Sequence, residues 1–182
     1  GPSNLKNFIS SALKNSYCKI SFPLKFIEVE NSAQTNTNVF EDELMEVKCA
    51  FLKHRLPAYG YRVNEKDKPG EFNLEKAKKL NIPVGPIYGR LHSGQIVELE
   101  DGRIFNGSDF CGKPKQGESF VYCTDTIFSN RAVELSKNVD LLVHESTFSE
   151  KDEEMAFEKL HSTTTMAAKT ALLSNAKKLV LT

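Results

Sequence analysis

The order of apolar and polar positions along the chain predicts alternating strands and helices. Residues 3–15 repeat apolar side chains at helical spacing, which predicts an amphipathic helix with Ser3 as its N-cap. Strand-like runs lie at 24–29, 45–52, 59–63, 96–99, 120–123, 139–143 and 179–181, and helical patterns at 74–80, 132–136, 151–160 and 164–173. From residue 119 onward the two kinds alternate cleanly, so we expect an α/β fold with helices packed on a sheet.

One stretch interrupts this alternation. Residues 65–94 carry Pro and Gly too often for core strands, at Pro69-Gly70 and again from Pro83 to Pro86. We therefore expect an inserted flexible arm at 65–94 that leaves the core after Val63 and rejoins it near Ile96. The core then consists of residues 1–64 and 95–182.

Composition narrows the class of protein. The 182 residues include 24 basic and 24 acidic side chains, which argues against a nucleic-acid binder driven by overall charge but not against a local basic surface. Residues 53–90 hold nine basic and four acidic side chains, a net +5, for which a solvated helix face is the alternative interpretation. No apolar run is long enough to span a bilayer, and we expect a cytoplasmic protein with four free thiols and no membrane association.

Candidate chemistry appears where predicted strands end. His54, Asp125 and Glu145 each follow such a run, and catalytic groups of open α/β sheets gather outside the carboxyl ends of strands. Imidazole and carboxylate suit zinc or another borderline divalent ion, and a carboxylate can bridge two ions, so we expect Asp125 to bridge and His54 to be a terminal ligand. Zinc needs four ligands. The others are expected outside these residues, because the strand-like run ending at Thr182 stops as though the chain were part of a larger protein.

His161 precedes a run of hydroxyl residues that can cap the next helix. A His in that position, oriented by a carboxylate such as Glu145, could give a proton to the leaving oxygen of a phosphate ester. The alternative is that His161 is only a neighbour of the helix cap.

An ordered series of short motifs gives the chain a family resemblance. The motifs are Gly1-Pro2, His54 with Pro57 and Tyr59-Gly60-Tyr61-Arg62, Glu65-Lys66-Asp67-Lys68-Pro69-Gly70, Pro83-Val84-Gly85-Pro86-Ile87-Tyr88-Gly89, Leu99-Glu100-Asp101-Gly102-Arg103, Asp125-Thr126, His144-Glu145-Ser146-Thr147-Phe148 and Leu160-His161-Ser162-Thr163. With them the chain resembles the C-terminal two-thirds of the ribonuclease Z family, the tRNA 3′-processing endonucleases of the metallo-β-lactamase superfamily. The short bacterial type is the most similar.

The resemblance implies a zinc-dependent endoribonuclease that removes 3′ trailers from tRNA precursors. It also implies an αββα sandwich, here without its N-terminal part, a homodimer, and two zinc ions per subunit. By position His54 and Asp125 match metal ligands, and Glu145 and His161 match the pair that assists departure of the leaving group. The arm at 65–94 matches the element that grips tRNA, with substrate-binding candidates Lys66, Lys68, Lys76, Lys78, Lys79, Gly85 and Pro86.

Two departures from the family pattern matter. The His-x-His-x-Asp-His signature does not occur in the chain, and the last His ligand is expected directly after Thr182. Ser146 replaces the Ala of the usual His-Glu-Ala-Thr motif. We therefore expect these 182 residues alone to be inactive. Two alternatives stay open: a hydrolase of small phosphodiesters or sulfate esters on the same fold, and a non-catalytic RNA-binding fragment.

Overall fold

The computed structural model describes residues 1–29 and 36–182, so residues 30–35 of the predicted core range 1–64 lie outside it. The described chain forms two compact units, one made of Gly1–Glu65 with Glu118–Thr182 and the other of Lys66–Gly117. The predicted arm at 65–94 is thus part of a longer insertion, which continues to Gly117.

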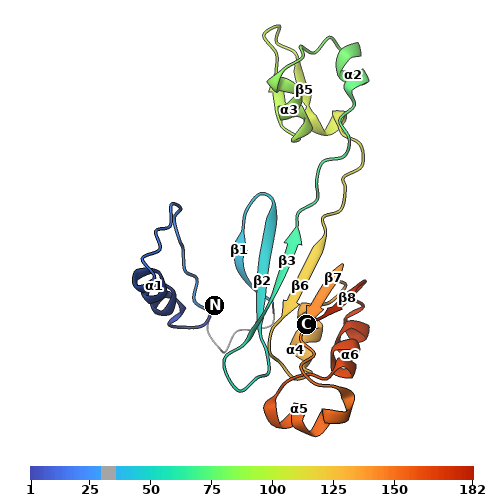
Figure 1. Ribbon diagram of the computed structural model, residues 1–182. Helices are drawn as coiled ribbons and strands as arrows, with labels where there is room; N and C mark the ends of the chain where they lie inside the picture. Colours follow the sequence, from blue (N-terminus) through green and yellow to red (C-terminus); the bar gives the residue numbers. More distant parts are fainter. Residues whose placement is uncertain (30–35) are drawn as a thin grey trace. The chain divides into compact units, whose positions relative to one another are not determined.

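The first unit contains a six-stranded mixed sheet in the order β1-β2-β3-β6-β7-β8 (Figure 1). Its strands are β1 (Thr37–Glu41), β2 (Met45–Phe51), β3 (Tyr59–Glu65), β6 (Ser119–Cys123), β7 (Leu141–His144) and β8 (Leu179–Leu181). Neighbours are antiparallel from β1 to β6, whereas β6, β7 and β8 run parallel. The parallel strands bring the ends of β6, β7 and β8 to the same edge of the sheet.

The helices of this unit are α1 (Leu5–Asn15), α4 (Asn130–Leu135), α5 (Glu153–Lys159) and α6 (Thr164–Ser174), with a 3₁₀ turn at Glu150–Asp152. Side chains of α4 pack on one face of the sheet, where Leu135, Val121 and Leu142 are fully buried in one apolar cluster. Along β6 burial alternates, because Phe120 and Tyr122 point to the other, partly exposed face. The sequence predicts this strand correctly from its continuous apolar run, Phe120–Cys123, and not from the alternation.

Two buried cysteines behave as small apolar side chains. Cys49 and Cys123 are fully buried, and burial raises the pKa of the Cys123 thiol to about 12. All four cysteines are free, as expected. No helix within 1–29 and 36–182 combines the length and the apolar character that a membrane span requires.

The predicted strand at 24–29 is wrong. Gly1 Nα donates to Ile27 O at 2.8 Å and Val29 N donates to Gly1 O at 2.8 Å, so this segment pairs with a single residue. One residue is too short a partner for a ladder. The helix α1 begins after Asn4, and Asn4 rather than the predicted Ser3 occupies the cap position, without a side-chain hydrogen bond.

The second unit has its own apolar core. It contains α2 (Leu74–Lys79), α3 (Pro86–His92), a hairpin of β4 (Ile96–Glu98) and β5 (Ile104–Asn106), and a 3₁₀ turn at Gly107–Phe110. Ala77, Leu91, Val97 and Phe110 are buried together. Packing is close at Gly107, where an added Cβ would come within 2.2 Å of Leu91 O, so only glycine fits. The predicted strand at 96–99 therefore pairs with β5 rather than rejoining the core sheet.

Candidate metal centre

His54 lies just beyond the end of β2 and is half-buried. Its Nδ1 lies 3.0 Å from the carbonyl oxygen of Leu160. A carbonyl only accepts, so Nδ1 carries the proton and donates it, which leaves the Nε2 lone pair available to a metal ion.

Asp125 follows β6 and is exposed. The residues on both sides of it are anchored: Thr124 Oγ1 donates to Tyr59 O at 3.1 Å, and Thr126 N donates to a Glu145 carboxylate oxygen at 2.9 Å. The main chain on both sides of Asp125 is therefore anchored, whereas its carboxylate faces solvent.

Glu145 is the most strongly held acidic side chain of the site, with 7% of its side chain exposed. One oxygen accepts from Thr126 N, from Ser162 N at 3.1 Å and from His161 Nδ1 at 2.8 Å. The other accepts from Thr147 N at 2.9 Å and Thr147 Oγ1 at 2.8 Å. Burial alone would raise the pKa of Glu145, but the hydrogen bonds from Thr147, Thr126 and Ser162 outweigh it and lower the pKa.

The Glu145 carboxylate fixes the tautomer of His161. An ionised carboxylate only accepts, so Nδ1 of His161 is protonated and Nε2 is the free ring atom. A His whose second nitrogen donates to a carboxylate is the usual arrangement around a metal ion. It is equally the arrangement of a proton donor whose charged form is stabilised.

The structure brings His54, Asp125 and His161 together. One ligand atom from each lies within 4.8 Å of the others, and the two imidazole rings have centroids 4.8 Å apart. Two imidazoles and a carboxylate are a donor set that zinc accepts. The geometry thus fits a metal ion with His161 either as a third ligand or beside it.

Leu160, between α5 and His161, has φ 57° and ψ 44°, a left-handed conformation that is unfavourable for a side chain of this size. This turn directs the Leu160 carbonyl to His54 and the next side chain, His161, to Glu145. The strained residue therefore positions both imidazoles.

His144, ahead of Glu145, is fully buried, and its Nδ1 lies 2.7 Å from the carbonyl oxygen of Glu145. Burial lowers the pKa of His144, so its ring is neutral near pH 7. His144 thus contacts the main chain at Glu145 and is not a member of the cluster of potential ligands.

Sequence reasoning missed the residues that hold this site, because most act through the main chain. Thr126, Thr147 and Ser162 give backbone N–H groups to Glu145, and Leu160 gives a carbonyl to His54. Only Thr147 contributes a side chain to this set, and a hydroxyl two residues after a carboxylate is the one available signal.

The predicted substrate-binding residues all lie in the second unit. Lys78, Lys79, Gly85 and Pro86 are exposed. Lys76 is exposed as well, but its ammonium is engaged, lying 2.7 Å from Asp109 O and 5.1 Å from the centroid of the Phe110 ring. The unit contains nine basic and seven acidic residues, a net charge of +2, which is less basic than the net +5 of residues 53–90.

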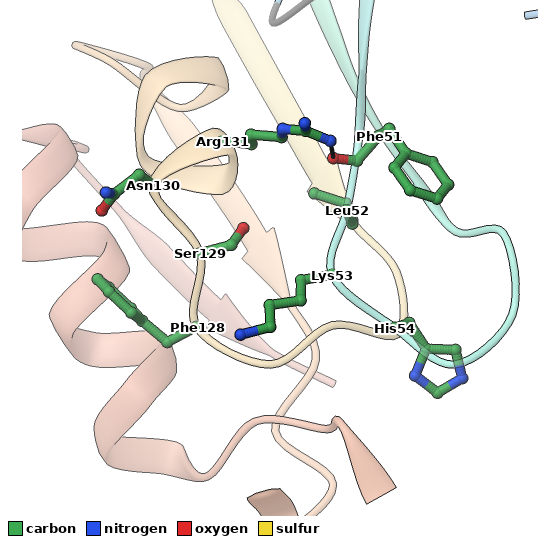
Figure 2. Close-up of a pocket in the computed structure, with 8 residues that line it drawn as sticks. All are labelled: Phe51, Leu52, Lys53, His54, Phe128, Ser129, Asn130 and Arg131. Carbon is green, nitrogen blue, oxygen red and sulfur yellow. Dashed lines mark hydrogen bonds between the residues drawn. The ribbon is translucent and has the colours of Figure 1, made fainter. Parts of the chain in front are cut away.

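A pocket opens beside the cluster and is lined by residues 51–54 and 128–131 (Figure 2). It encloses about 560 Å³, and His54 belongs both to its wall and to the cluster. Among the residues that the structure describes, His54 is thus the one that the lining of this pocket shares with the cluster.

The chain is similar to curated proteins over its whole length. Ribonuclease Z of Prochlorococcus marinus strain MIT 9515 is 68% identical and that of strain NATL2A is 54% identical, each over all 182 residues. The chain spans 58% of the length of these relatives. No protein-family model matches it.

Among solved structures, human tRNase Z, short form, aligns with all of this chain and with 58% of its own, at a TM-score of 0.62 and 24% identity. That likeness concerns the fold, and the predicted α/β fold class is confirmed. The resemblance predicted from the motifs is likewise confirmed, and over its whole length this chain is similar to the ribonuclease Z family.

Proposed function

We propose that the protein containing this chain is a zinc-dependent endoribonuclease that removes 3′ trailers from tRNA precursors. The observation that carries the proposal is the cluster of His54, Asp125 and His161 in a chain that aligns throughout with ribonuclease Z. We also propose the homodimer and the two zinc ions per subunit that the resemblance implies. Asp125 is then the bridging ligand and His54 a terminal one.

Two side chains of this chain, His54 and Asp125, are arranged to bind zinc. His54 presents Nε2 because its Nδ1 proton is held by Leu160 O, and Asp125 presents a carboxylate whose two oxygens can bind two ions. When bound, zinc supplies Lewis acidity and lowers the pKa of the attacking water. Other ligands are expected from residues that align outside this chain.

His161 is proposed to give a proton to the departing 3′ oxygen of the tRNA. Glu145 holds the opposite ring nitrogen at 2.8 Å and stabilises the imidazolium before transfer. Loss of the proton from Nε2 leaves a neutral ring still donating to Glu145. The products are a tRNA with a 3′-hydroxyl and a trailer with a 5′-phosphate.

The second unit, Lys66–Gly117, is proposed to bind the tRNA body. Lys78 and Lys79 are exposed neighbours on α2, and Val84, beside Gly85 and Pro86, is 79% exposed. Contacts of lysine with phosphate recognise an RNA duplex by its backbone rather than by its sequence.

The proposal is tested with the protein at the length of its relatives. A precursor tRNA with a labelled trailer should be cut once, with a 5′-phosphate on the trailer, and a chelator should stop cleavage until zinc is restored. Cleavage at scattered positions, or cleavage unaffected by the chelator, would contradict it. Turnover of a small phosphodiester without tRNA cleavage would favour the alternative hydrolase.

The same preparation separates the two roles that the geometry allows for His161. Replacing His161 with Ala should lower the single-turnover rate roughly 10²–10⁴-fold, the contribution of a general acid, with zinc content unchanged. His92→Ala, outside the cluster, is the matched control. Loss of zinc from the His161 variant alone would make His161 a ligand instead.

A further inference from the structure

The pocket lined by residues 51–54 and 128–131, here called the Lys53 pocket, is not used by the chemistry described above (Figure 2). Hydrogen bonds join the first wall, at Lys53, to the residues just before the second wall. Lys53 N donates to Thr126 Oγ1 at 3.2 Å, and Ile127 N donates to Lys53 O at 3.0 Å. The pocket is therefore pre-formed, and its volume of about 560 Å³ lies within the range of ligand sites, about 300–1,000 Å³.

The charge of the Lys53 pocket is positive. Lys53 and Arg131 line it, and no carboxylate does. Within 1–29 and 36–182 neither side chain forms an ion pair, and Arg131 makes only a long hydrogen bond of 3.5 Å to Phe51 O. Figure 2 shows the Lys53 side chain extending toward the 128–131 wall, whereas the His54 ring points the opposite way. An anion entering the pocket thus meets two cations that form no ion pair in the described part of the chain, although Glu150 and Glu153 line a neighbouring pocket together with Lys53.

Aromatic rings complete the lining. Phe128 is half-buried, and Lys169 Nζ lies 4.6 Å from its ring centroid. The Arg131 guanidinium carbon lies 6.0 Å from the centroid of Phe51. Aromatic faces next to basic side chains are the chemistry that binds single-stranded RNA, since bases stack on the rings and phosphates meet the cations. A duplex does not present unstacked bases in this way.

We propose that the Lys53 pocket binds unpaired nucleotides of the RNA substrate, with Lys53 and Arg131 on phosphate groups and Phe128 under a base. His54 belongs to both the pocket lining and the ligand cluster, and its ring points away from the Lys53 side chain. This inference rests on the proposed function. The unpaired nucleotides belong either to the 3′ trailer or to the acceptor end of the tRNA.

The test measures equilibrium binding rather than cleavage, in the zinc-loaded protein at the length of its relatives. The probe is a fluorescent single-stranded RNA of about eight nucleotides, inside the usual footprint of about 4–16. The variants are Lys53→Met, Arg131→Gln, Phe128→Ala and Phe128→Tyr. Lys178→Met, an exposed lysine outside the pocket, is the matched control, and circular dichroism establishes that each variant is folded.

Phe128→Ala should weaken binding roughly 5- to 150-fold, and Phe128→Tyr, which keeps the ring, should restore it. Lys53→Met and Arg131→Gln should each flatten the dependence of log affinity on log salt by about 0.7. The control should bind as the unaltered protein does. Failure of the unaltered protein to bind the probe, or affinities and salt slopes unchanged in all four variants, would overturn the inference.

Two further arms identify the occupant and separate the inference from the proposed function. If only the affinity for a precursor with a trailer falls in the variants, the pocket holds the trailer. If the affinity for a tRNA without one falls equally, it holds the acceptor end. Probe binding that depends on the pocket without any tRNA cleavage would leave this inference standing and refute the proposed function, and the reverse result would do the opposite.

Discussion

Glu145→Gln tests whether a single carboxylate organises the site. The side chain joins three segments: the loop carrying Asp125, the end of β7, and the turn before α6. Gln keeps the size but replaces one acceptor oxygen with an NH₂ donor. In the better of its two orientations this donor faces Thr147 N, which then has no acceptor, while the Thr147 hydroxyl can rotate to accept.

The size of the effect follows from these contacts. One unsatisfied buried N–H costs about 1–3 kcal/mol, and the three bonds to the remaining oxygen each lose the strength that the charge gave them. Burial of the charge partly offsets this, because burial disfavours the carboxylate. We therefore expect Glu145→Gln to lower the free energy of unfolding at pH 7 by about 2–4 kcal/mol.

The pH dependence gives the prediction a sign. The pKa of Glu145 is lowered in the folded protein, so its stabilisation is present above the unfolded pKa of about 4.3 and is lost as pH falls through the folded pKa. The difference in stability between the unaltered protein and the Gln variant should shrink accordingly between pH 7 and pH 3. Urea unfolding at several pH values measures it.

The matched control is Glu134→Gln on α4, an exposed side chain, for which we expect a change within about 0.5 kcal/mol. If the two variants were equally stable at pH 7, Glu145 would not hold the three segments. If the difference did not vary with pH, it would come from packing rather than from the charge.

Three other predictions concern Asp125, the second unit and Asp140. Asp125→Ala should remove both zinc ions and cleavage, so two ions per subunit by elemental analysis would refute the bridging role. Replacing Lys66–Gly117 with a two-residue turn should keep the first unit folded, because Glu65 N already lies 2.9 Å from Glu118 O. In this variant KM for precursor tRNA should rise, while hydrolysis of bis(p-nitrophenyl) phosphate persists. Equal loss of both activities would contradict a tRNA-binding role for the second unit. Hydrogen bonds from Lys177 and Ser119 lower the pKa of Asp140 to about 2, so Asp140→Asn should cost about 1–2 kcal/mol at pH 7, discounted for the exposure of Lys177. That cost should vanish as pH falls from about 4 to 2, and a constant cost in urea titrations would exclude the ion pair as its source.

The fold was predictable where apolar residues are concentrated in short runs. β2, β6 and α6 lie within one or two residues of their predicted ranges. The helix α3 was missed because Gly85-Pro86 indicates a turn, although Pro is favourable in the first turn of a helix. The second unit was underestimated because β4 has the pattern of a core strand, and its partner β5 is only three residues long.

The sequence predicted which residues form the site, but not the hydrogen bonds and the turn that hold them in place. Strand ends indicated His54, Asp125 and Glu145, and the structure brings them into one region with His161. The backbone donors and the left-handed Leu160 have no side-chain signature. The pattern of apolar residues predicts which side chains are buried, whereas these groups act through the conformation of the main chain.

The left-handed conformation of Leu160 is unfavourable for folding, but it positions two residues of the site. Glycine adopts its left-handed conformation without a steric penalty, so folding alone would favour glycine there. Glycine would also increase the mobility of the turn that positions His54 and His161. Directed evolution that selects only for heat resistance should accept Gly at this position. We expect the recovered variant to have a higher melting temperature and a lower rate of the proposed cleavage.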